Sequence, residues 1–278
     1  MQNVNLSSPI VWDAPLNRGL LRWWLCLPNV LRGNTWRELT RKSDATISGA
    51  SVAGARGRQG GWGCYEFDGT NDSGQTGAID LSGVSQLTIA MWLYIIAYAT
   101  NDLLIESSPD ANSNTGALQI NLDNTGAWTQ RIKTATGNNT SNLSPRPSAG
   151  AWFHYILCAN RSVGAQQFVA AYVNGVSQTL TSVATDTSSS GGFGNYQWNF
   201  CSRNAASLFA NLRLDDFRMY NRVLRDSEAL ELYRTSKAGY PHELRWLRGM
   251  RASEQAAGAG SGLLRRLQTE GLFVGSAC

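Results

Sequence analysis

Apolar and polar residues alternate along many short stretches of this chain, with turn-forming residues between them. The clearest stretch is residues 212–220, whose apolar members are Leu212, Leu214, Phe217 and Met219. Alternation with a period of two predicts a strand that is buried on one face. The pair Asp215-Asp216 shifts the alternation by one residue, as a β-bulge does. We therefore predict a bulged strand over residues 212–220.

A short helix is predicted directly after that strand. Asp226 or Ser227 can cap it, because a side-chain oxygen accepts a hydrogen bond from the free N–H groups of a first helical turn. Leu230 and Tyr233 are three residues apart, so they share one face of the helix. The strand, the corner and the helix together are typical of a unit that closes a domain.

The other apolar stretches predict further strands. They cover residues 20–27, 87–94, 103–106, 117–122, 152–158 and 170–176. Residues 103–106 and 117–122 are predicted to pair as a hairpin, and Asn174-Gly175 predicts the turn of another. We expect residues 20–27 to pair beside the closing strand. Many short strands with turn signals between them indicate an all-β sandwich.

Composition agrees with this fold class. Of the 278 residues only 16% are charged, 28 are Gly and 10 are Trp, which suits short strands and polar turns better than a helical bundle. The net charge of +4 is uneven, since residues 1–60 carry +5, residues 61–235 carry −4 and residues 236–278 carry +3. Basic ends suggest terminal segments that contact an acidic protein surface, with nucleic acid as the less favoured partner; the alternative is that these charges only face solvent.

Five cysteines are spread along the chain, at Cys26, Cys64, Cys158, Cys201 and Cys278. Their spacing fits neither a zinc knuckle nor a redox motif, and an odd number argues against a complete disulfide framework. The first residues lack the pattern of a signal peptide, and the apolar stretches are too short to span a bilayer. We therefore expect free thiols and folding in a reducing cytoplasm, without a membrane partner.

Several of these stretches carry motifs of one family. They are Gly19-Leu20-x-x-Trp23-Trp24, Phe67-Asp68-Gly69-x-x-Asp72, Trp152-x-His154, and the run Leu214-Asp215-Asp216-Phe217-Arg218-Met219-Tyr220. With them the chain resembles laminin-G-like domains of the concanavalin A-like lectin superfamily. The opening, with Pro15-Leu16-Asn17-Arg18 before Gly19, is similar to that of laminin-G-like proteins from tailed phages and prophages.

The resemblance implies a jelly-roll sandwich of two antiparallel sheets over residues 20–235. An N-terminal segment, residues 1–19, precedes it. One short helix follows the closing strand, and residues 236–278 form a C-terminal arm. Residues 256–262 of that arm have the composition of a flexible linker, with small apolar clusters behind it that a neighbouring subunit could bind. The alternative is a disordered tail.

A calcium site is one candidate function of the Phe-Asp-Gly motif. Asp68, Asn71 and Asp72 offer hard oxygen ligands, and the resemblance implies that Asp215 or Asp216 could complete a structural calcium site. The alternative is a turn in which these side chains accept hydrogen bonds from local N–H groups. Residue types alone leave both alternatives open.

Catalysis is not expected. Related glucanases carry Glu-x-Asp-x-x-Glu on one strand, which places two working carboxylates about 5 Å apart. Here Glu66 and Asp68 are present, but Asn71 stands in place of the third carboxylate. The two histidines, His154 and His242, belong to no legible catalytic group, and His154 is predicted to be a strand residue.

Glycan binding is a second candidate function. The polar stretches 107–116, 135–150 and 181–194 predict loops, which rim the sandwich in jelly-roll lectins. Four aromatic residues are candidates for stacking on a sugar, namely Trp128, Phe193, Tyr196 and Trp198. The alternative is that these side chains fill the core of the sandwich.

These inferences lead to two hypotheses about function. In the first, the chain is a non-enzymatic virion structural protein of a tailed phage, on the capsid or the tail. It assembles in the host cytoplasm with other virion proteins and with copies of itself, and it displays a lectin-like sandwich to host surface glycans. In the second, it is a carbohydrate-binding module of a cell-surface or secreted protein.

Overall fold

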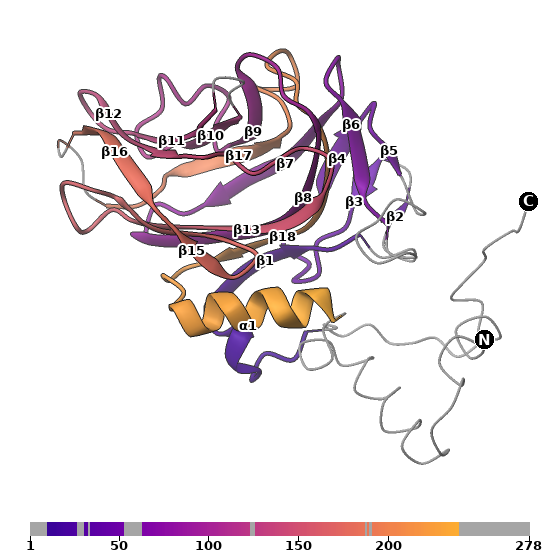
Figure 1. Ribbon diagram of the computed structural model, residues 1–278, viewed down its shortest axis with the longest axis horizontal. Coiled ribbons are helices and arrows are strands. Elements are labelled where there is room, and N and C mark those ends of the chain that lie inside the picture. Colours follow the sequence, from indigo (N-terminus) through magenta and orange to yellow (C-terminus); the bar gives the residue numbers. More distant parts are fainter. Residues whose placement is uncertain are drawn as a thin grey trace, which may run out of the picture.

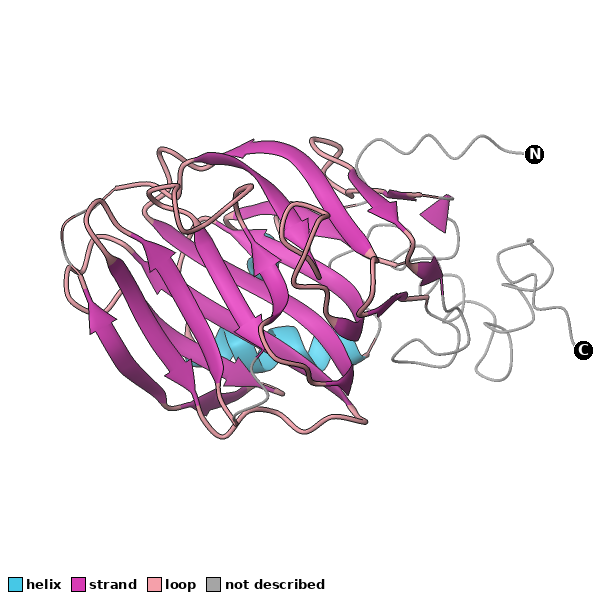
Figure 2. Ribbon diagram, turned by 90° about the horizontal axis from the view of Figure 1, so that it is seen from above, coloured by secondary structure: helices cyan, strands magenta, loops and turns pink. Residues whose placement is uncertain are grey.

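Two antiparallel β-sheets stack face to face, and one helix lies beneath them (Figure 1). The computed structural model describes residues 10–26, 31–32, 34–52, 63–122, 126–186, 188 and 191–238. Seen from above, the strands of the upper sheet cross the molecule and the helix shows below them (Figure 2). This architecture confirms the predicted sandwich. No helix in these residues is both long and apolar enough to cross a membrane.

The lower sheet has eight strands in the described part of the chain. They are β1 (Leu20–Trp24), β5 (Ser51–Val52), β6 (Tyr65–Asp68), β8 (Gln86–Ala97), β13 (Trp152–Asn160), β14 (Phe168–Val173), β15 (Val176–Gln178) and β18 (Asn211–Tyr220). Their order is β15-β14-β13-β8-β18-β6-β5, and β1 also pairs with β18. A short 3-10 helix, Pro15–Asn17, precedes β1.

The upper sheet has ten described strands. They are β2 (Leu31–Arg32), β3 (Thr35–Trp36), β4 (Ala45–Ser48), β7 (Ser73–Asp80), β9 (Asp102–Glu106), β10 (Leu118–Leu122), β11 (Trp128–Lys133), β12 (Asn138–Leu143), β16 (Leu180–Thr185) and β17 (Asn195–Phe200). Their order is β16-β12-β11-β10-β9-β17-β7-β4-β3-β2. Strands β9 and β10 pair as predicted, and so do β14 and β15 around Asn174-Gly175.

Strand β18 lies at the centre of the lower sheet. One edge pairs with β8, and the other pairs with β6 through its first half and with β1 through its second half. The register shifts between Asp215 and Arg218, and Asp216 has a left-handed φ of 56°. The predicted bulge is therefore confirmed, and the predicted pairing of residues 20–27 with the closing strand is confirmed over Leu20–Trp24. The bulge is where β18 passes from one neighbour to the other.

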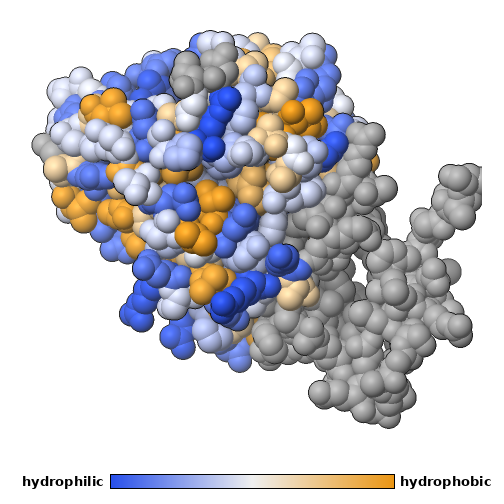
Figure 3. Space-filling model, viewed as in Figure 1, coloured by the Kyte–Doolittle hydropathy of each residue, from blue (hydrophilic) through white to orange (hydrophobic). Residues whose placement is uncertain are grey.

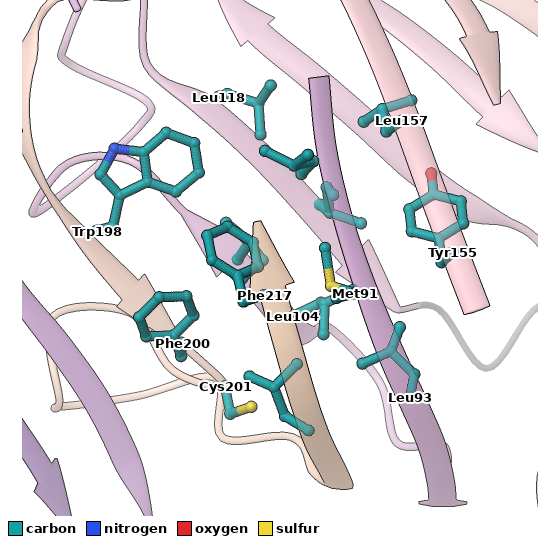
Figure 4. Close-up of a cluster of buried hydrophobic side chains, with 14 of the residues drawn as sticks. Met91, Leu93, Leu104, Leu118, Tyr155, Leu157, Trp198, Phe200, Cys201 and Phe217 are labelled. Atoms are coloured by element: carbon teal, nitrogen blue, oxygen red, sulfur yellow. The ribbon is translucent and has the colours of Figure 1, made fainter. Parts of the chain in front are cut away.

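The main core lies between the sheets. Phe217 of β18 packs against Phe200 of β17 and Trp24 of β1, with ring centroids 5.0 and 5.6 Å apart. Figure 4 shows Phe200, Phe217 and Trp198 beside Met91 and other apolar side chains that come from both sheets. Alternate residues of each strand supply this core because neighbouring side chains in a strand point to opposite faces.

A second apolar cluster lies outside the lower sheet, where α1 (Asp226–Lys237) covers it. Ala229 and Leu232 of α1 are buried there. The helix begins after Arg225 rather than at the predicted cap, and Glu228 Oε2 accepts a hydrogen bond from the Arg225 N–H at 2.9 Å. An acidic side chain in the first turn accepts a hydrogen bond from a free N–H, and its negative charge interacts favourably with the positive end of the helix dipole.

Two stretches predicted as loops contain strands. Residues 135–150 include β12, and residues 181–194 include all of β16 but its first residue, Leu180. The apolar pattern is absent from β12 because Asn139 and Ser141, not apolar residues, occupy its buried positions. It is absent from β16 because that strand ends the sheet and exposes most of its side chains.

The predicted C-terminal arm falls almost wholly outside the described residues, which end at residue 238. Helix α1 continues to Lys237, two residues into the predicted arm. Of the five cysteines, the four in the described residues (Cys26, Cys64, Cys158 and Cys201) are free and buried, and Cys278 lies outside them.

Candidate functional site

The outer face of the upper sheet carries a row of polar residues. The register pairs Gln75 with Asn199, Asn199 with Glu106, Glu106 with Gln119, and Gln119 with Arg131. Residues opposite each other in neighbouring strands point to the same side. The intervening positions, such as Phe200, Ile105 and Ile120, point into the core. The row therefore lies on the side of the sheet that faces away from α1.

We call this surface the amide–arginine face and define it by Gln75, Gln197, Asn199, Asn204, Arg131 and Arg203. Buried Asn199 lies at its centre, where its Nδ2 donates to the Ser108 carbonyl at 2.6 Å. Its Oδ1 accepts hydrogen bonds from Gln75 Nε2 at 2.9 Å and Gln197 Nε2 at 3.2 Å. The bonds of Asn199 therefore fix the direction of the two glutamine amides.

The acceptor oxygens of these two glutamines are open. Both side chains are half-buried, and their Nε2 groups also donate to Asn204 Oδ1. Within the described residues, Oε1 of Gln75 and Gln197 accepts no hydrogen bond. Gly77 lies on the same face of β7, and a Cβ there would meet no atom within 4 Å. Amide oxygens that accept no hydrogen bond within the protein can accept one from a hydroxyl group of a ligand.

A buried ion pair anchors the other half of the face. Glu106 has no exposed surface, and Arg203 reaches it with Nε at 3.1 Å from Oε2 and Nη2 at 3.0 Å from Oε1. The Ala111 N–H also donates to Glu106 Oε1 at 2.8 Å. Burial raises the pKa of Glu106 above its ordinary value, although the hydrogen bonds from Arg203 and Ala111 lower it. Glu106 thereby fastens two loops, residues 107–116 and 201–210, to the sheet.

Arg131 completes the row from β11. Its guanidinium donates to Asn112 Oδ1 at 2.7 Å and to the Gln119 side-chain oxygen. Arg131 and Arg203 are both half-buried, so each presents part of a planar guanidinium to solvent. Such forks bind oxygen pairs well.

The loop that carries Arg203 and Asn204 has an unusual backbone. Cys201, Asn204, Ala205 and Leu208 all have positive φ angles, of 51–58°. Each such non-glycine residue costs of order 1–3 kcal/mol and persists only where surrounding contacts enforce it. Two backbone bonds close this loop, from Arg203 N to Ser207 O at 2.7 Å and from Ala210 N to Cys201 O at 3.0 Å. The loop thus holds its two polar side chains in a set position over the sheet.

The predicted calcium ligands form two separate groups. Asp68 Oδ1 accepts from the Thr70 N–H at 2.7 Å, and Asp72 Oδ2 accepts from the Asp68 N–H at 2.9 Å, as the turn alternative requires. Asn71 is exposed on the same turn. Asp68 pairs with Asn211, and Asp215 is four residues further along β18, which is about 13 Å at the usual rise of a strand.

Asp215 and Asp216 instead join β1 to β18. Asp215 Oδ1 accepts from the Cys26 N–H at 2.9 Å, and Asp216 Oδ1 accepts from Trp23 Nε1 at 2.7 Å and from Arg218 Nε at 3.1 Å. Among the residues described, no group of three or more His, Cys, Asp or Glu side chains could hold a metal ion. The residues present therefore do not fit the predicted calcium site.

Three of the four candidate sugar-stacking aromatics are core residues. Trp128, Phe193 and Trp198 are almost fully buried, as the alternative from the sequence had it. Trp128 packs on Tyr155 of the lower sheet with centroids 5.1 Å apart. Tyr196 is half-buried at the rim, where its hydroxyl donates to the Thr115 carbonyl at 2.9 Å. Of the four, only Tyr196 is placed to meet a ligand.

Glu66 and His154, which were considered for catalysis, make contacts that stabilise the fold. Glu66 Oε2 accepts from Arg213 Nε at 2.6 Å across the outer face of the lower sheet. His154 is buried in β13, as predicted, and packs against Trp92 and Tyr233 with centroids 5.3 and 6.2 Å away. His242 lies outside the described residues.

The sequence analysis missed the amide–arginine face. Gln119, Arg131 and Asn199 are polar members of alternating strands, which is the one signal that they share. Only the pairing of β7, β17, β9, β10 and β11 brings them into one row.

Solved structures of two kinds share this fold. A sialidase of Trypanosoma rangeli has a TM-score of 0.56 at 14% identity, over 78% of this chain and 33% of the sialidase. The binding domain of Paraclostridial Mosquitocidal Protein 1 has a TM-score of 0.58 at 17% identity, over 78% and 52% of the two chains. The receptor binding domain of botulinum neurotoxin mosaic serotype C/D has a TM-score of 0.57 at 12% identity, over 78% and 50%.

The chain thus spans between a third and about half of these proteins, and identities this low establish a common fold alone. No curated protein matches the chain. The family described as the concanavalin A-like lectin/glucanases superfamily matches residues 68–229, more than half of the 278 residues. Together with the two stacked antiparallel sheets, this match shows that the chain belongs to the concanavalin A-like lectin/glucanase superfamily.

Proposed function

We propose that this protein is a non-enzymatic virion structural protein of a tailed phage, and that its amide–arginine face binds surface glycans of the host. The observation that carries the glycan proposal is the pair of amide side chains of Gln75 and Gln197, both held through their Nε2 groups by Asn199, on the same face as the open surface at Gly77. Sugar hydroxyls both donate and accept, so they suit a surface that offers amide acceptors and guanidinium donors together.

Pre-organisation favours binding by this face. Its central side chains are already held by hydrogen bonds, so little side-chain freedom remains to be lost when a ligand is bound. The left-handed residues of the loop 201–208 keep Arg203 and Asn204 over the sheet.

The state of the carboxylates supports a binding role without catalysis. A glycosidase needs one carboxyl group to donate a proton and a second to act as nucleophile or base. Glu106 is enclosed by Arg203 and the Ala111 N–H, and Glu66 is paired with Arg213. Neither is poised to exchange a proton with a sugar oxygen.

Three features support the virion part of the proposal. The opening Pro15-Leu16-Asn17-Arg18-Gly19 resembles that of phage laminin-G-like proteins, and residues 1–60 carry a net charge of +5. The four cysteines of the described residues are free, which suits assembly in a reducing cytoplasm. The partners would be other virion proteins. The basic ends of this chain would contact acidic surfaces on those partners.

Glycan binding is tested with variants of the face. Gln197→Ala removes one acceptor, and the matched control Gln178→Ala removes an amide from β15 in the other sheet. Loss of one hydrogen bond costs about 0.5–1.5 kcal/mol, so we expect Gln197→Ala to weaken binding of host surface polysaccharide about two- to tenfold. The control should bind as the wild type does.

Two results would remove parts of the proposal. If host polysaccharides do not bind the wild type, or bind Gln197→Ala equally well, the amide–arginine face is not a glycan site. If purified phage particles from a producing host lack the chain by mass spectrometry while the protein binds glycans, it is a carbohydrate-binding module of another kind of protein.

A further inference from the structure

The corner at which the chain leaves β18 lies against the turn that precedes β1. The Asn221 N–H donates to the Gly19 carbonyl at 2.9 Å, and Arg222 Nε donates to the Arg18 carbonyl at 2.7 Å. Gly19 has a φ of 73°, and a Cβ there would lie 2.6 Å from Asn221 Oδ1. Glycine suits both this backbone angle and this close approach. The two segments are therefore held together, and Figure 1 shows the indigo start of the described chain beside α1.

A hollow of about 280 Å³ opens at this corner. Its walls are formed by Arg18, Arg222, Val223, Arg225 and Glu228. Ligand pockets usually measure about 300–1,000 Å³, so this one suits a small group. Three guanidinium groups against one carboxylate give its walls a net charge of +2, although residues 61–235 together carry −4. Figure 3 shows hydrophilic residues gathered along the lower border of the molecule, where Figure 1 draws α1.

Arg222 is held in place within these walls. Its Nη1 donates to Glu228 Oε2 at 2.7 Å, and the Arg225 N–H donates to the same oxygen at 2.9 Å. Although burial raises the pKa of Glu228, these two hydrogen bonds keep it below its ordinary value, so the carboxylate stays charged at neutral pH. Arg222 Nη2 is buried and has no hydrogen-bond partner among the described residues. An acceptor supplied by a ligand would satisfy this donor.

Arg18 and Arg225 bring charges that no ion pair compensates. Both side chains are exposed, and neither forms an ion pair in the part of the chain that the structure describes. Planar guanidinium groups bind pairs of oxygen atoms on anions such as phosphate. The two exposed arginines can therefore close on an anion in the hollow while Arg222 stays in place.

We propose that this hollow is a binding site for a phosphate group. A phosphate monoester carries a charge of about −2 at pH 7, which matches the net charge of the walls, whereas a carboxylate would compensate only half of it. Val223 offers an apolar wall to the organic part of a phosphorylated ligand. The amide–arginine face lies outside the upper sheet and α1 lies outside the lower one. The two sites are therefore separate, and the phosphate site does not depend on what that face binds.

Titration with inorganic phosphate tests the site. We expect saturable binding to the full-length protein by isothermal titration calorimetry, with sodium chloride of equal ionic strength as the reference. Arg18→Gln and Arg225→Gln each remove one exposed guanidinium, so each variant should bind phosphate about tenfold more weakly. The matched control is Arg234→Gln, which removes an exposed arginine from the last turn of the same helix. The control should bind as the wild type does, and all three variants should keep the wild-type melting temperature.

Competition identifies the source of the phosphate group. Glycerol 1-phosphate represents a small phosphate monoester, and poly(glycerol phosphate) represents a phosphodiester polymer of a cell surface. A diester carries a single negative charge for each phosphate, so we expect the monoester to displace inorganic phosphate at the lower concentration of phosphate groups. Displacement by the polymer at the lower concentration would assign the same phosphate site to a surface polymer. A wild type without saturable phosphate binding, a heat signal that sodium chloride reproduces, or equal weakening in Arg225→Gln and Arg234→Gln would overturn the proposal.

Discussion

The Arg203–Glu106 ion pair gives a prediction whose size follows from its surroundings. Arg203→Ala removes every hydrogen bond from the guanidinium and leaves Glu106, which has no exposed surface, with the Ala111 N–H as its remaining donor among the described residues. Removing one partner of a buried pair costs about 3–5 kcal/mol, because the other charge stays buried without compensation. The carboxylate of Glu106 can avoid this penalty only by binding a proton.

Protonation of Glu106 therefore limits the stability that Arg203→Ala can lose. The ordinary pKa of this carboxyl group is 4.5, and holding it protonated costs about 1.4 kcal/mol for each pH unit above that value. The cost is therefore about 3.4 kcal/mol at pH 7 and below about 1 kcal/mol at pH 5. We expect Arg203→Ala to lower the free energy of unfolding by about 3 kcal/mol at pH 7 and by much less at pH 5.

The direction of this pH dependence follows from proton binding to Glu106. Burial already raises the pKa of Glu106 in the folded wild type, and loss of Arg203 would raise it further. A carboxyl group with a raised pKa holds more protons in the folded than in the unfolded state, so its stabilising effect is complete below the unfolded pKa and is lost as the pH rises through the folded pKa. The difference between the variant and the wild type should therefore widen from pH 5 to pH 8.

Urea unfolding followed by tryptophan fluorescence at pH 5, 6, 7 and 8 measures this difference. Arg213→Ala is the matched control, since Arg213 pairs with Glu66 at 2.6 Å with both side chains partly exposed. Glu66 keeps contact with solvent after this substitution and can stay charged, so the loss of stability in the control should not change between pH 5 and pH 8. In the double variant Arg203→Ala/Glu106→Gln, residue 106 no longer carries a carboxylate. The loss in free energy of unfolding should then be the same at every pH. A penalty for Arg203→Ala that is the same at pH 5 and pH 8 would refute the reasoning.

Three further outcomes are expected. Asp216→Asn, which keeps a residue tolerant of the left-handed backbone, should lower the free energy of unfolding by about 1.5–3 kcal/mol because it weakens the buried hydrogen bonds that Trp23 and Arg218 donate to this carboxylate; a loss below about 1 kcal/mol in urea unfolding would contradict this. Neither a chelator nor added calcium should shift the melting temperature, since Asp68, Asp72, Asp215 and Asp216 are already hydrogen-bonded; a rise with calcium would support the metal site. Deleting residues 240–278 should leave a folded sandwich that no longer enters phage particles; normal incorporation would place attachment elsewhere, with the basic residues 1–60 as the next candidate.

Local pattern was enough for the elements whose residues alternate strongly. Strand β18, its bulge and the helix after it could be predicted because the alternating apolar positions, the pair Asp215-Asp216 and the capping residues near Asp226 are signals within a few residues. The same pattern failed for β12 and β16. Their strand conformation comes from pairing with neighbours, and their side chains are largely polar.

By itself, the sequence determined the sandwich class, the hairpin at Asn174-Gly175 and the closing strand, because these depend on period-two burial and on turn chemistry. Tertiary structure alone decided that Trp128 and Trp198 fill the core, since alternation shows that two faces exist but not which one meets the other sheet. It also decided the amide–arginine face. Gln75 and Asn199 are 124 positions apart and meet only through the pairing of β7 with β17. Long-range register is a property of the assembled sheets, and no local stretch of residues encodes it.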